Sequence, residues 1–479
     1  MVPRGPLCQS ACATSPLWGP AWPCSQEVRR ICSMGDFPST LCSSTGPRAE
    51  KMQLAVRLLL LLATLLALSR GQPHPEHPES SGTNSSHEKV PGTGDGSTHP
   101  SIVASNTGFA LRFYQLMAAE FPGKNIFFSP LSISTSLVML ALGAQAQTQR
   151  QIFQGLGLNL TEMPEAEIHS SFQHLMNTVN LAKEKMEAHV GNALFLQERM
   201  SLLPKFQNDT RAFYQAQLFL TNFQDSVGAT QLINEHVKKE TRGMISDLVS
   251  ELSTDTVMVL VNFIYFKALW EKPFPAYRTR PQDFYVDEQT TVTVPMMVQS
   301  EHHHWYLHDR HLPCSVLRMD YEGDASAFFI LPDFGAMQLV EEALTPELLA
   351  RWNNLLSKRG YFYKKVELRL PKFSISGSYE LDQLLPKLGF TDLFSERANF
   401  SGITNMLNLK MSKSFHKATL DVDEVGTKAA AGSAGSFALK SAPMKPLVLS
   451  FNRPFLLVVF LDTTQDILFW GRVANPTEP

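Results

Sequence analysis

Residues 257–266 read Val-Met-Val-Leu-Val-Asn-Phe-Ile-Tyr-Phe, and this run constrains the fold more than any other part of the chain. It is rich in β-branched and aromatic residues, and apolar side chains do not alternate with polar ones. Such a pattern is typical of a strand that is buried on both faces. A strand of this kind needs a layer of structure on each side, so we expect a large layered domain.

Further strand signals follow this run, whereas helical spacing dominates before about residue 250. Phe109 to Met117, for example, repeats apolar residues at helical spacing. The remaining strands are expected at 327–331, 366–370, 447–451, 455–461 and 467–470. We find no internal repeat and no second linker. The sequence therefore predicts one α+β domain over about 104–479, although length alone would suggest two domains.

The first hundred residues differ in character from this domain. Five of the six cysteines lie within the first 42 residues, and only Cys314 lies beyond them. Met52, Arg57 and the eleven apolar residues 58–68 have the layout of a secretory signal peptide, and the run is shorter than the roughly 20 residues that span a bilayer. We therefore interpret 1–51 as an upstream extension, 52–71 as the signal peptide and 72–103, rich in Pro, Gly, Ser and Thr, as a disordered tail.

Charge and glycosylation signals also favour an extracellular protein. The chain has 42 Lys and Arg against 45 Asp and Glu, a net charge of −3, which argues against a nucleic-acid binder. N-glycosylation sequons begin at Asn84, Asn159, Asn208 and Asn399. We expect a secreted, glycosylated monomer that binds neither nucleic acid nor membrane.

Residues 426–438 form a segment made almost entirely of Gly, Ala, Ser and Thr. One interpretation is a flexible linker between domains. The strand-like run 418–424 precedes it, however, and the closing core strands follow it. We therefore expect a long exposed loop that is anchored in sheet at both ends, and loops of this length are usually functional.

Five blocks of the sequence resemble the serpin family of serine protease inhibitors in order and spacing. They are 125–132, 262–270, 415–427, 451–455 and 469–476. The resemblance implies an α+β serpin fold with about nine helices packed on three β-sheets and an exposed reactive loop. It also implies an inhibitor and not an enzyme. A serine protease attacks the loop to form an acyl-enzyme, and the cleaved loop then inserts into the main sheet. A non-inhibitory hormone carrier is the alternative, because the family also contains such proteins.

Loop insertion places demands on the hinge that this sequence meets. By resemblance the hinge comprises Glu424, Gly426, Thr427, Ala429, Ala430 and Ala431. Side chains of an inserted strand alternate between core and solvent. The core-facing set is then Thr427, Ala429, Ala431, Ser433, Gly435 and Phe437, of which only the last is large. Lys428 would face solvent, at a position where serpins usually have Glu.

Family spacing places the scissile bond fourteen residues after Gly426, between Lys440 and Ser441. A lysine before the cut fits a protease whose primary pocket ends in an aspartate, as in trypsin. Phe437 and Leu439 would occupy neighbouring subsites. The partner is thus expected to be a trypsin-like serine protease in a covalent complex. The alternative is that Lys440 merely keeps the loop soluble.

Several buried polar residues match the family's sheet-opening region beneath the main sheet. They are Ser129, Ser132, Asn262 and His416, and Trp270 in the same region is expected to cap the top of the sheet. A Ser/His pair could also suggest a hydrolase. Because no Gly-x-Ser-x-Gly elbow surrounds either serine, we predict a buried hydrogen-bond cluster instead.

Two further clusters stand out. Histidines at 302, 303, 304, 308 and 311 lie near Cys314, but their spacing matches no closed Cys/His site, and we predict no metal and no cofactor. A basic cluster is interleaved with aromatic residues. It comprises Lys358, Arg359, Lys364, Lys365 and Lys372. This cluster is interpreted either as a solvated strand edge or as a site for heparin or another sulfated glycosaminoglycan.

Overall fold

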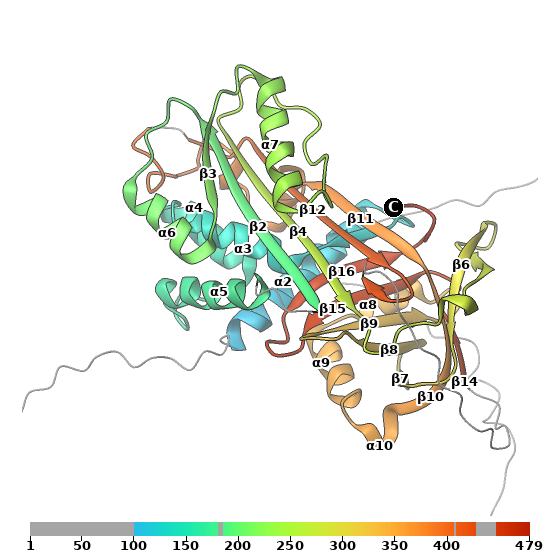
Figure 1. Ribbon diagram of the computed structural model, residues 1–479. Helices are drawn as coiled ribbons and strands as arrows, with labels where there is room; N and C mark the ends of the chain where they lie inside the picture. The colour runs from blue at the N-terminus through green and yellow to red at the C-terminus, as the bar shows by residue number, and fades with distance from the viewer. Residues whose placement is uncertain (1–99, 181–184, 407–408, 428–446) are drawn as a thin grey trace, which may run out of the picture. The chain divides into compact units, whose positions relative to one another are not determined.

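The computed structural model describes residues 100–180, 185–406, 409–427 and 447–479, all within one compact unit, Gly92–Pro479 (Figure 1). The predicted upstream extension, the signal peptide, residues 72–99 of the tail and most of the reactive loop lie outside the described residues. The first described element is a helix from Pro100, slightly before the expected domain boundary at 104. Proline is common at the start of a helix, because its missing N–H would have no intrahelical partner there.

Helices dominate the first part of the described chain, as helical spacing predicts. They are α2 (Pro100–Glu120), α3 (Pro130–Ala141), α4 (Ala146–Leu156), α5 (Glu165–Asn180), α6 (Pro204–Tyr214) and α7 (Ser226–Glu240). Later helices are shorter: α8 (Met337–Ala343), α9 (Pro346–Leu355), α10 (Arg359–Phe362) and α11 (Leu381–Leu384). Short 3-10 turns are η1 (Ala276–Arg278), η2 (Leu385–Leu388) and η3 (Asp392–Phe394). Ser129 caps α3 by accepting a hydrogen bond from the backbone N–H of Ser132, and Pro130 supplies the first helical residue.

The central sheet has the order β11-β12-β4-β2-β3, with the short β13 also paired to β4. Its strands are β2 (Met186–Gln197), β3 (Gln217–Thr221), β4 (Met258–Leu269), β11 (Phe373–Glu380), β12 (Lys413–Val422) and β13 (Gly426–Thr427). The pairs β4/β12 and β2/β3 are parallel, and the other neighbours in this sheet are antiparallel. The apolar run at 257–266 is therefore the middle of this sheet.

A second, ten-stranded sheet has the order β1-β16-β15-β9-β8-β7-β10-β6-β5, with β14 paired to β10. Its strands are β1 (Ile126–Phe128), β5 (Arg280–Tyr285), β6 (Thr291–Gln299), β7 (His303–His308), β8 (Cys314–Asp320), β9 (Ala325–Pro332), β10 (Tyr363–Pro371), β14 (Leu447–Ser450), β15 (Phe455–Leu461) and β16 (Ile467–Val473). The first residues of β10 pair with β7 and its last residues pair with β6. Strand β10 joins the two groups of strands, so that the second and third of the three expected sheets are continuous through it.

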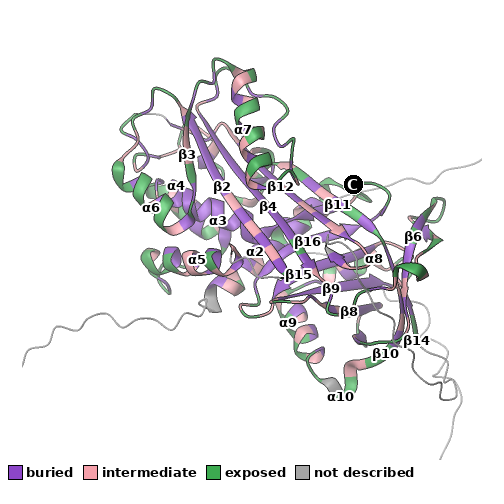
Figure 2. Ribbon diagram, viewed as in Figure 1, coloured by how far each residue is buried: buried purple, intermediate pink, exposed green. Residues whose placement is uncertain are grey.

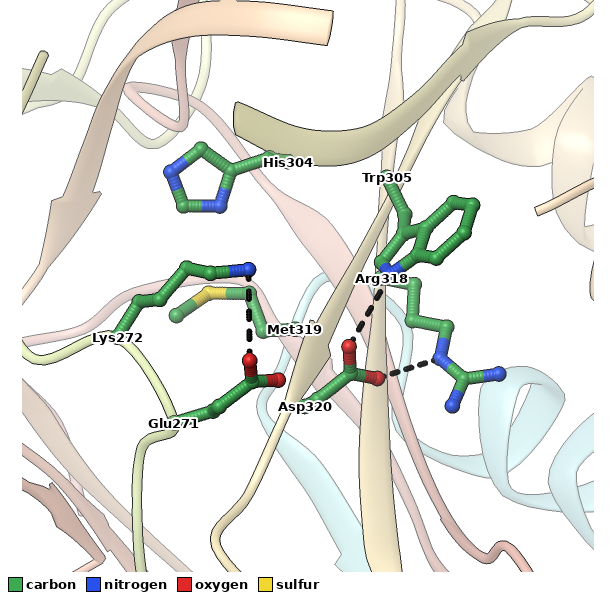
Figure 3. Close-up of a pocket in the computed structure, with 7 residues that line it drawn as sticks. All are labelled: Glu271, Lys272, His304, Trp305, Arg318, Met319 and Asp320. Carbon is green, nitrogen blue, oxygen red and sulfur yellow. Dashed lines mark hydrogen bonds and ion pairs between the residues drawn. The ribbon is translucent and has the colours of Figure 1, made fainter. Parts of the chain in front are cut away.

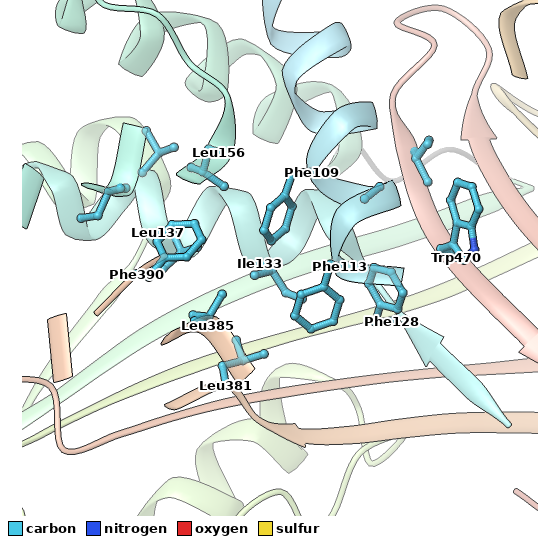
Figure 4. Close-up of a cluster of buried hydrophobic side chains, with 14 of the residues drawn as sticks. Phe109, Phe113, Phe128, Ile133, Leu137, Leu156, Leu381, Leu385, Phe390 and Trp470 are labelled. Carbon is cyan, nitrogen blue, oxygen red and sulfur yellow. The ribbon is translucent and has the colours of Figure 1, made fainter. Parts of the chain in front are cut away.

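Strand β4 is covered on both faces, which confirms the interpretation of its apolar run. Val259, Val261 and Phe263 pack in one hydrophobic cluster with Ile233 and Val237 of α7. Ile264, Phe266 and Ala268, on the opposite face, belong to a cluster shared with the second sheet. Buried residues accordingly run along the central strands, whereas the outer side of α7 is exposed (Figure 2). A third cluster lies beneath the helices and includes Phe109, Phe113, Phe128 and Trp470 (Figure 4).

No helix within the described ranges is long and apolar enough to cross a bilayer.

Candidate functional site: a parting sheet and a loop hinge

The central sheet parts between β4 and β12. These strands pair over seven residues, from Lys413 opposite Val259 to Thr419 opposite Tyr265. Beyond that point β13 takes the place of β12, with Gly426 opposite Leu269 and Thr427 opposite Ala268. The described part of the predicted hinge, 424–427, therefore lies beside β4 at the point where β12 leaves it.

Beneath this seam lies the polar cluster that the sequence predicts. The backbone N–H of Ser129 donates to His416 Nε2 at 3.0 Å, and His416 Nδ1 lies 2.6 Å from Asn262 Oδ1. Asn262 Nδ2 donates to the carbonyl of Ser132 at 2.7 Å and to Asn192 Oδ1 at 2.8 Å. Since Nε2 accepts a hydrogen bond, the ring must be neutral and must donate through Nδ1. Burial lowers the pKa of His416 to about 3, which agrees with this state.

This geometry does not provide a hydrolase site. His416 Nε2 accepts from a backbone N–H, and the hydroxyl of Ser129 accepts from the N–H of Ser132 as a helix cap. The cluster instead joins β4 to β12 and to the start of α3. Asn192 also belongs to it, although sequence reasoning did not identify this residue. The signal that identifies Asn192 is its position directly opposite Asn262, which is known only once β2 is paired with β4.

The hinge residue Glu424 is held by side chains from two other segments. Glu424 accepts hydrogen bonds from Lys372 Nζ at 2.8 Å and from the Thr279 hydroxyl at 2.9 Å. Burial acts to raise the pKa of Glu424, but these hydrogen bonds and the charge of Lys372 outweigh it, and the pKa is lowered. The carboxylate of Glu424 therefore anchors the entry to the loop.

Gly426 occupies a position that only glycine fits. Its φ is +151°, and a Cβ built there would lie 2.2 Å from the carbonyl oxygen of Ala268. Its N–H and that of Val425 donate to Asp423 Oδ1 at 3.1 and 2.9 Å. The close approach of β13 to β4 therefore depends on the missing side chain.

Trp270 closes the same end of the sheet, as predicted. Its ring stacks on Tyr321 with centroids 4.2 Å apart, and its Nε1 donates to the carbonyl of Asp423 at 3.1 Å. A hydrogen bond therefore joins the hinge to a stacked pair of aromatic rings.

The predicted basic cluster divides in the structure. Lys358 is exposed at the start of α10, and Lys364 and Lys365 are exposed at the start of β10. Lys372 lies beyond the other end of β10, roughly 26 Å along an extended chain from Lys364, and is bound to Glu424. We therefore assign Lys372 to the hinge and not to the basic patch. Nothing is described of the Arg359 side chain.

The other predicted residues fall in separate places. Asn159 and Asn208 are exposed and Asn399 is partly exposed, while Asn84 lies outside the described residues. Cys314 is buried, and burial raises the pKa of its thiol to about 12. Within the described ranges no three His, Cys, Asp or Glu side chains gather as a metal site. The remaining loop predictions also lie outside the described residues: Lys428, Ala429, Ala430, Ala431, Phe437, Leu439, Lys440 and Ser441.

The chain belongs to the serpin family. The family model described as "Serpin (serine protease inhibitor)" matches residues 104–476. This match confirms the family resemblance inferred from the five sequence blocks and the mixed α/β fold that it implies.

Within the family the chain is similar to kallistatin. It is 63% identical to human kallistatin over 430 residues, which is 89% of this chain and 100% of that protein. The crystal structure of human glycosylated kallistatin covers 79% of this chain and 99% of its own, with a TM-score of 0.75 at 63% identity. A structure of cleaved kallistatin complexed with heparin covers 68% of this chain and 95% of its own, with a TM-score of 0.66 at 66% identity.

A carrier protein is also among the relatives. Corticosteroid-binding globulin of sheep (Ovis aries) is 44% identical over 380 residues, 79% of this chain and 86% of that protein. Membership of the family therefore does not by itself separate inhibition from hormone carriage.

Proposed function

We propose that this protein inhibits trypsin-like serine proteases, tissue kallikrein among them, by loop cleavage, acyl-enzyme trapping and loop insertion. The observation that carries this proposal is the pairing of β13 with β4 where β12 leaves the sheet. Insertion needs a starting point at which the loop already occupies the register of the future strand. Gly426 and Thr427 occupy that register.

The register of β13 predicts where the rest of the loop would fall. Continuing one residue at a time, Ala429 falls opposite Phe266, Ala431 opposite Ile264 and Ser433 opposite Asn262. The partners Ile264 and Phe266 face the buried cluster of the second sheet. Small loop side chains suit that face, since opposing residues of an antiparallel pair share one side of a sheet.

Insertion would also require the polar cluster beneath the seam to open. A strand between β4 and β12 separates Asn262 from His416, which are opposite each other in the present pairing. The side-chain hydrogen bond between them must therefore break. In return, the new strand would pair along both of its edges, and so the uncleaved fold is held kinetically short of its most stable state.

Protease selectivity would reside in the loop before the cut. Lys440 would enter an aspartate-ended primary pocket, and Leu439 and Phe437 would fill neighbouring subsites. Tissue kallikrein is proposed on the similarity to kallistatin, and trypsin is the general probe of the lysine specificity.

Lys440→Ala tests the assigned bond. Incubation of the unmodified chain with trypsin should give a covalent band at the summed mass on a denaturing gel, and Lys440→Ala should abolish that band. Lys445→Ala is the matched control, because Lys445 precedes Pro446 and should not be cleaved. Complete turnover to cleaved chain with active protease left over would refute inhibition. A covalent band that persists in Lys440→Ala would refute the assigned bond.

A hormone-carrier function is less well supported. The small-residue hinge is a feature that carriage does not require.

We also propose that the basic patch binds heparin or another sulfated glycosaminoglycan. The patch comprises Lys358, Arg359, Lys364 and Lys365, without Lys372. Its described lysines are exposed, and the similarity to kallistatin, which was crystallised with heparin after cleavage, supports the proposal. Lys364→Ala/Lys365→Ala should elute from heparin at lower salt than the unmodified chain, and Lys372→Ala should elute unchanged. Equal elution of all three would contradict it.

Secretion with glycans at Asn84, Asn159, Asn208 and Asn399 completes the proposal. The exposure of Asn159 and Asn208 is compatible with modification. Peptide mapping of protein from the culture medium should find glycans at these positions, and unmodified sequons in secreted protein would contradict the assignment.

A further inference from the structure

The basic patch extends from β10 onto the neighbouring strand β7. Strand β10 begins in antiparallel register with β7, so that Lys365 lies opposite His303 and Tyr363 lies opposite Trp305. Directly opposite residues of an antiparallel pair lie on the same face with Cβ atoms about 5 Å apart. The imidazole of His303 and the ammonium group of Lys365 therefore belong to one surface. Both side chains are exposed, as is that of the preceding His302.

The position of His303 on this surface is fixed by stacking. Its ring lies nearly parallel to that of Tyr363, with centroids 5.6 Å apart and an interplanar angle of 20°. Tyr363 is held in turn by Lys272, whose Nζ donates to its hydroxyl at 2.8 Å, and by Trp305, whose ring centroid lies 4.8 Å away. The ring of His303 is therefore stacked on Tyr363, and Tyr363 is itself held by Lys272 and Trp305.

Trp305, which supports Tyr363, is itself held by a hydrogen bond (Figure 3). Trp305 Nε1 donates to Asp320 at 3.1 Å, and Arg318 Nε donates to the same carboxylate at 2.6 Å. His304 lies on the opposite face of β7 from His303 and is buried in this region. Burial lowers the pKa of His304 to about 3, so that its ring remains neutral and it adds no charge to the patch.

The charged groups near the two exposed histidines carry both signs. Lys365 lies opposite His303 from β10, and Lys272 approaches His302 from the segment after β4. Each acidic neighbour is paired with a cation: Arg278 binds Glu301 at 2.8 Å, and Lys272 Nζ lies 3.8 Å from the carboxylate of Glu271. Lys364 pairs with the buried His304 and approaches the ring of Tyr306 at 5.9 Å, so it lies on the other face of the strand pair. An incoming polyanion thus meets acidic groups whose charge is already partly neutralised.

We propose that this surface, formed by Lys365, His303 and His302, is a pH-dependent site whose affinity for a sulfated glycosaminoglycan rises as pH falls from 7.5 to 5.5. The inference rests on the proposed glycosaminoglycan binding and specifies its regulation. Histidine is the side chain whose charge ordinarily changes between pH 5 and 8, so acidification adds positive charge beside Lys365. Sulfate groups prefer such charged donors.

The electrostatics of His302 also couple it to the ligand. Partial burial, followed by the charge of Lys272, lowers the pKa of His302 below its usual value. A row of bound sulfates favours the protonated ring and opposes this shift. Protonation and polyanion binding therefore reinforce each other.

The test measures the Kd of the full-length glycosylated protein for a fluorescent heparin oligosaccharide at pH 7.5 and pH 5.5 and constant ionic strength. The unmodified chain should bind about two- to thirty-fold more tightly at pH 5.5, the range expected for up to two added exposed ion pairs. His302→Gln/His303→Gln should bind like the unmodified chain at pH 7.5 and should lose most of the gain at pH 5.5. His308→Gln/His311→Gln is the matched control, since both histidines are exposed elsewhere, and it should keep the gain.

The outcomes separate this inference from the proposal on which it rests. Binding at pH 7.5 that depends on Lys364 and Lys365 but does not strengthen on acidification would overturn the pH-dependent site alone. A gain that survives in His302→Gln/His303→Gln, or is lost in the control, would overturn it too. Absence of binding at both pH values would overturn both proposals. A thermal unfolding scan of each variant at both pH values ensures that folded proteins are compared.

Discussion

At the residue scale, His416 is the most sensitive point of the sheet seam. Its ring is neutral, fully buried and bound on both nitrogens by groups that belong to different elements. Protonation would place a hydrogen on Nε2 facing the N–H of Ser129, and the cluster would have to open. The seam is therefore sensitive to acid through one side chain.

The first prediction concerns the pH dependence of stability. The pKa of His416 is about 3 in the folded chain and near 6.5 in an unfolded one, so the unfolded chain takes up a proton first as pH falls. The stabilising contribution is complete above about pH 6.5 and is lost progressively from there down to about pH 3. At pH 5 the loss is about 2 kcal/mol.

Denaturant unfolding of the unmodified chain and of His416→Gln at pH 7.5 and pH 5 measures this contribution. The variant should be less stable at pH 7.5 but should lose about 2 kcal/mol less on acidification. Equal losses in the two proteins would show that another group carries the pH dependence.

A second prediction concerns Gly426. Gly426→Ala introduces backbone strain at φ +151° and a clash with the carbonyl of Ala268, which together cost about 1–3 kcal/mol at the hinge. Pairing of β13 with β4 should weaken, and more chain should be consumed per protease trapped. Gly335→Ala is the control, because φ is also positive there but open space surrounds the site, and its stoichiometry of inhibition should not change.

At the scale of elements, the sequence predicted strands and helices well but not their partners. The run at 257–266 was correctly interpreted as a strand covered on both faces, because apolar residues on both sides of a strand can only be buried. Periodicity reports the face of a single element and carries no information about register. Asn192 in the polar cluster, Lys372 at the hinge and the double pairing of β10 therefore emerged only from the structure.

The register of β13 leads to a third prediction, at Lys428. If the loop continues along β4, Lys428 falls opposite the exposed Lys267, and like charges directly opposite on a sheet destabilise it by roughly 0.2–1 kcal/mol. Lys428→Glu should thus hasten insertion and bring the stoichiometry of inhibition closer to one. The gain should shrink at high salt, since the pair is exposed to solvent.

Lys267→Glu in the otherwise unmodified chain is the complementary variant. It should also remove the repulsion from Lys428, although it places a like charge opposite Glu187 on β2. Combining Lys428→Glu with Lys267→Glu should restore the slow insertion. No change in any of the three variants would mean that the loop does not follow the register of β13.

At the scale of the whole molecule, the proposed mechanism requires a central sheet that can accept a further strand. The seven paired residues between β4 and β12 hold the sheet closed, and the hinge at β13 marks where a further strand would enter. The fold could be predicted from the periodicity of apolar residues and from the five family blocks. The pairing of β4 with β12 could not, because it depends on contacts between residues far apart in the chain.

A fourth prediction follows for cleaved chain. Cleavage between Lys440 and Ser441 should allow the loop to pair with both β4 and β12, and the thermal midpoint should rise by more than about 10 °C. Differential scanning of intact and cleaved protein checks this. Nicking elsewhere on the described surface should lower the midpoint or leave it unchanged.

Hydrogen–deuterium exchange of residues 428–437, measured before and after protease attack, tests loop insertion most directly. We expect residues 428–437 to exchange fast in the intact chain and to be strongly protected in the trapped complex, because each inserted N–H then donates to β4 or β12. Peptides from β4 and β12 should remain protected in both states. Exchange in residues 428–437 that stays fast after the protease has been trapped would contradict insertion and, with it, the proposed mechanism.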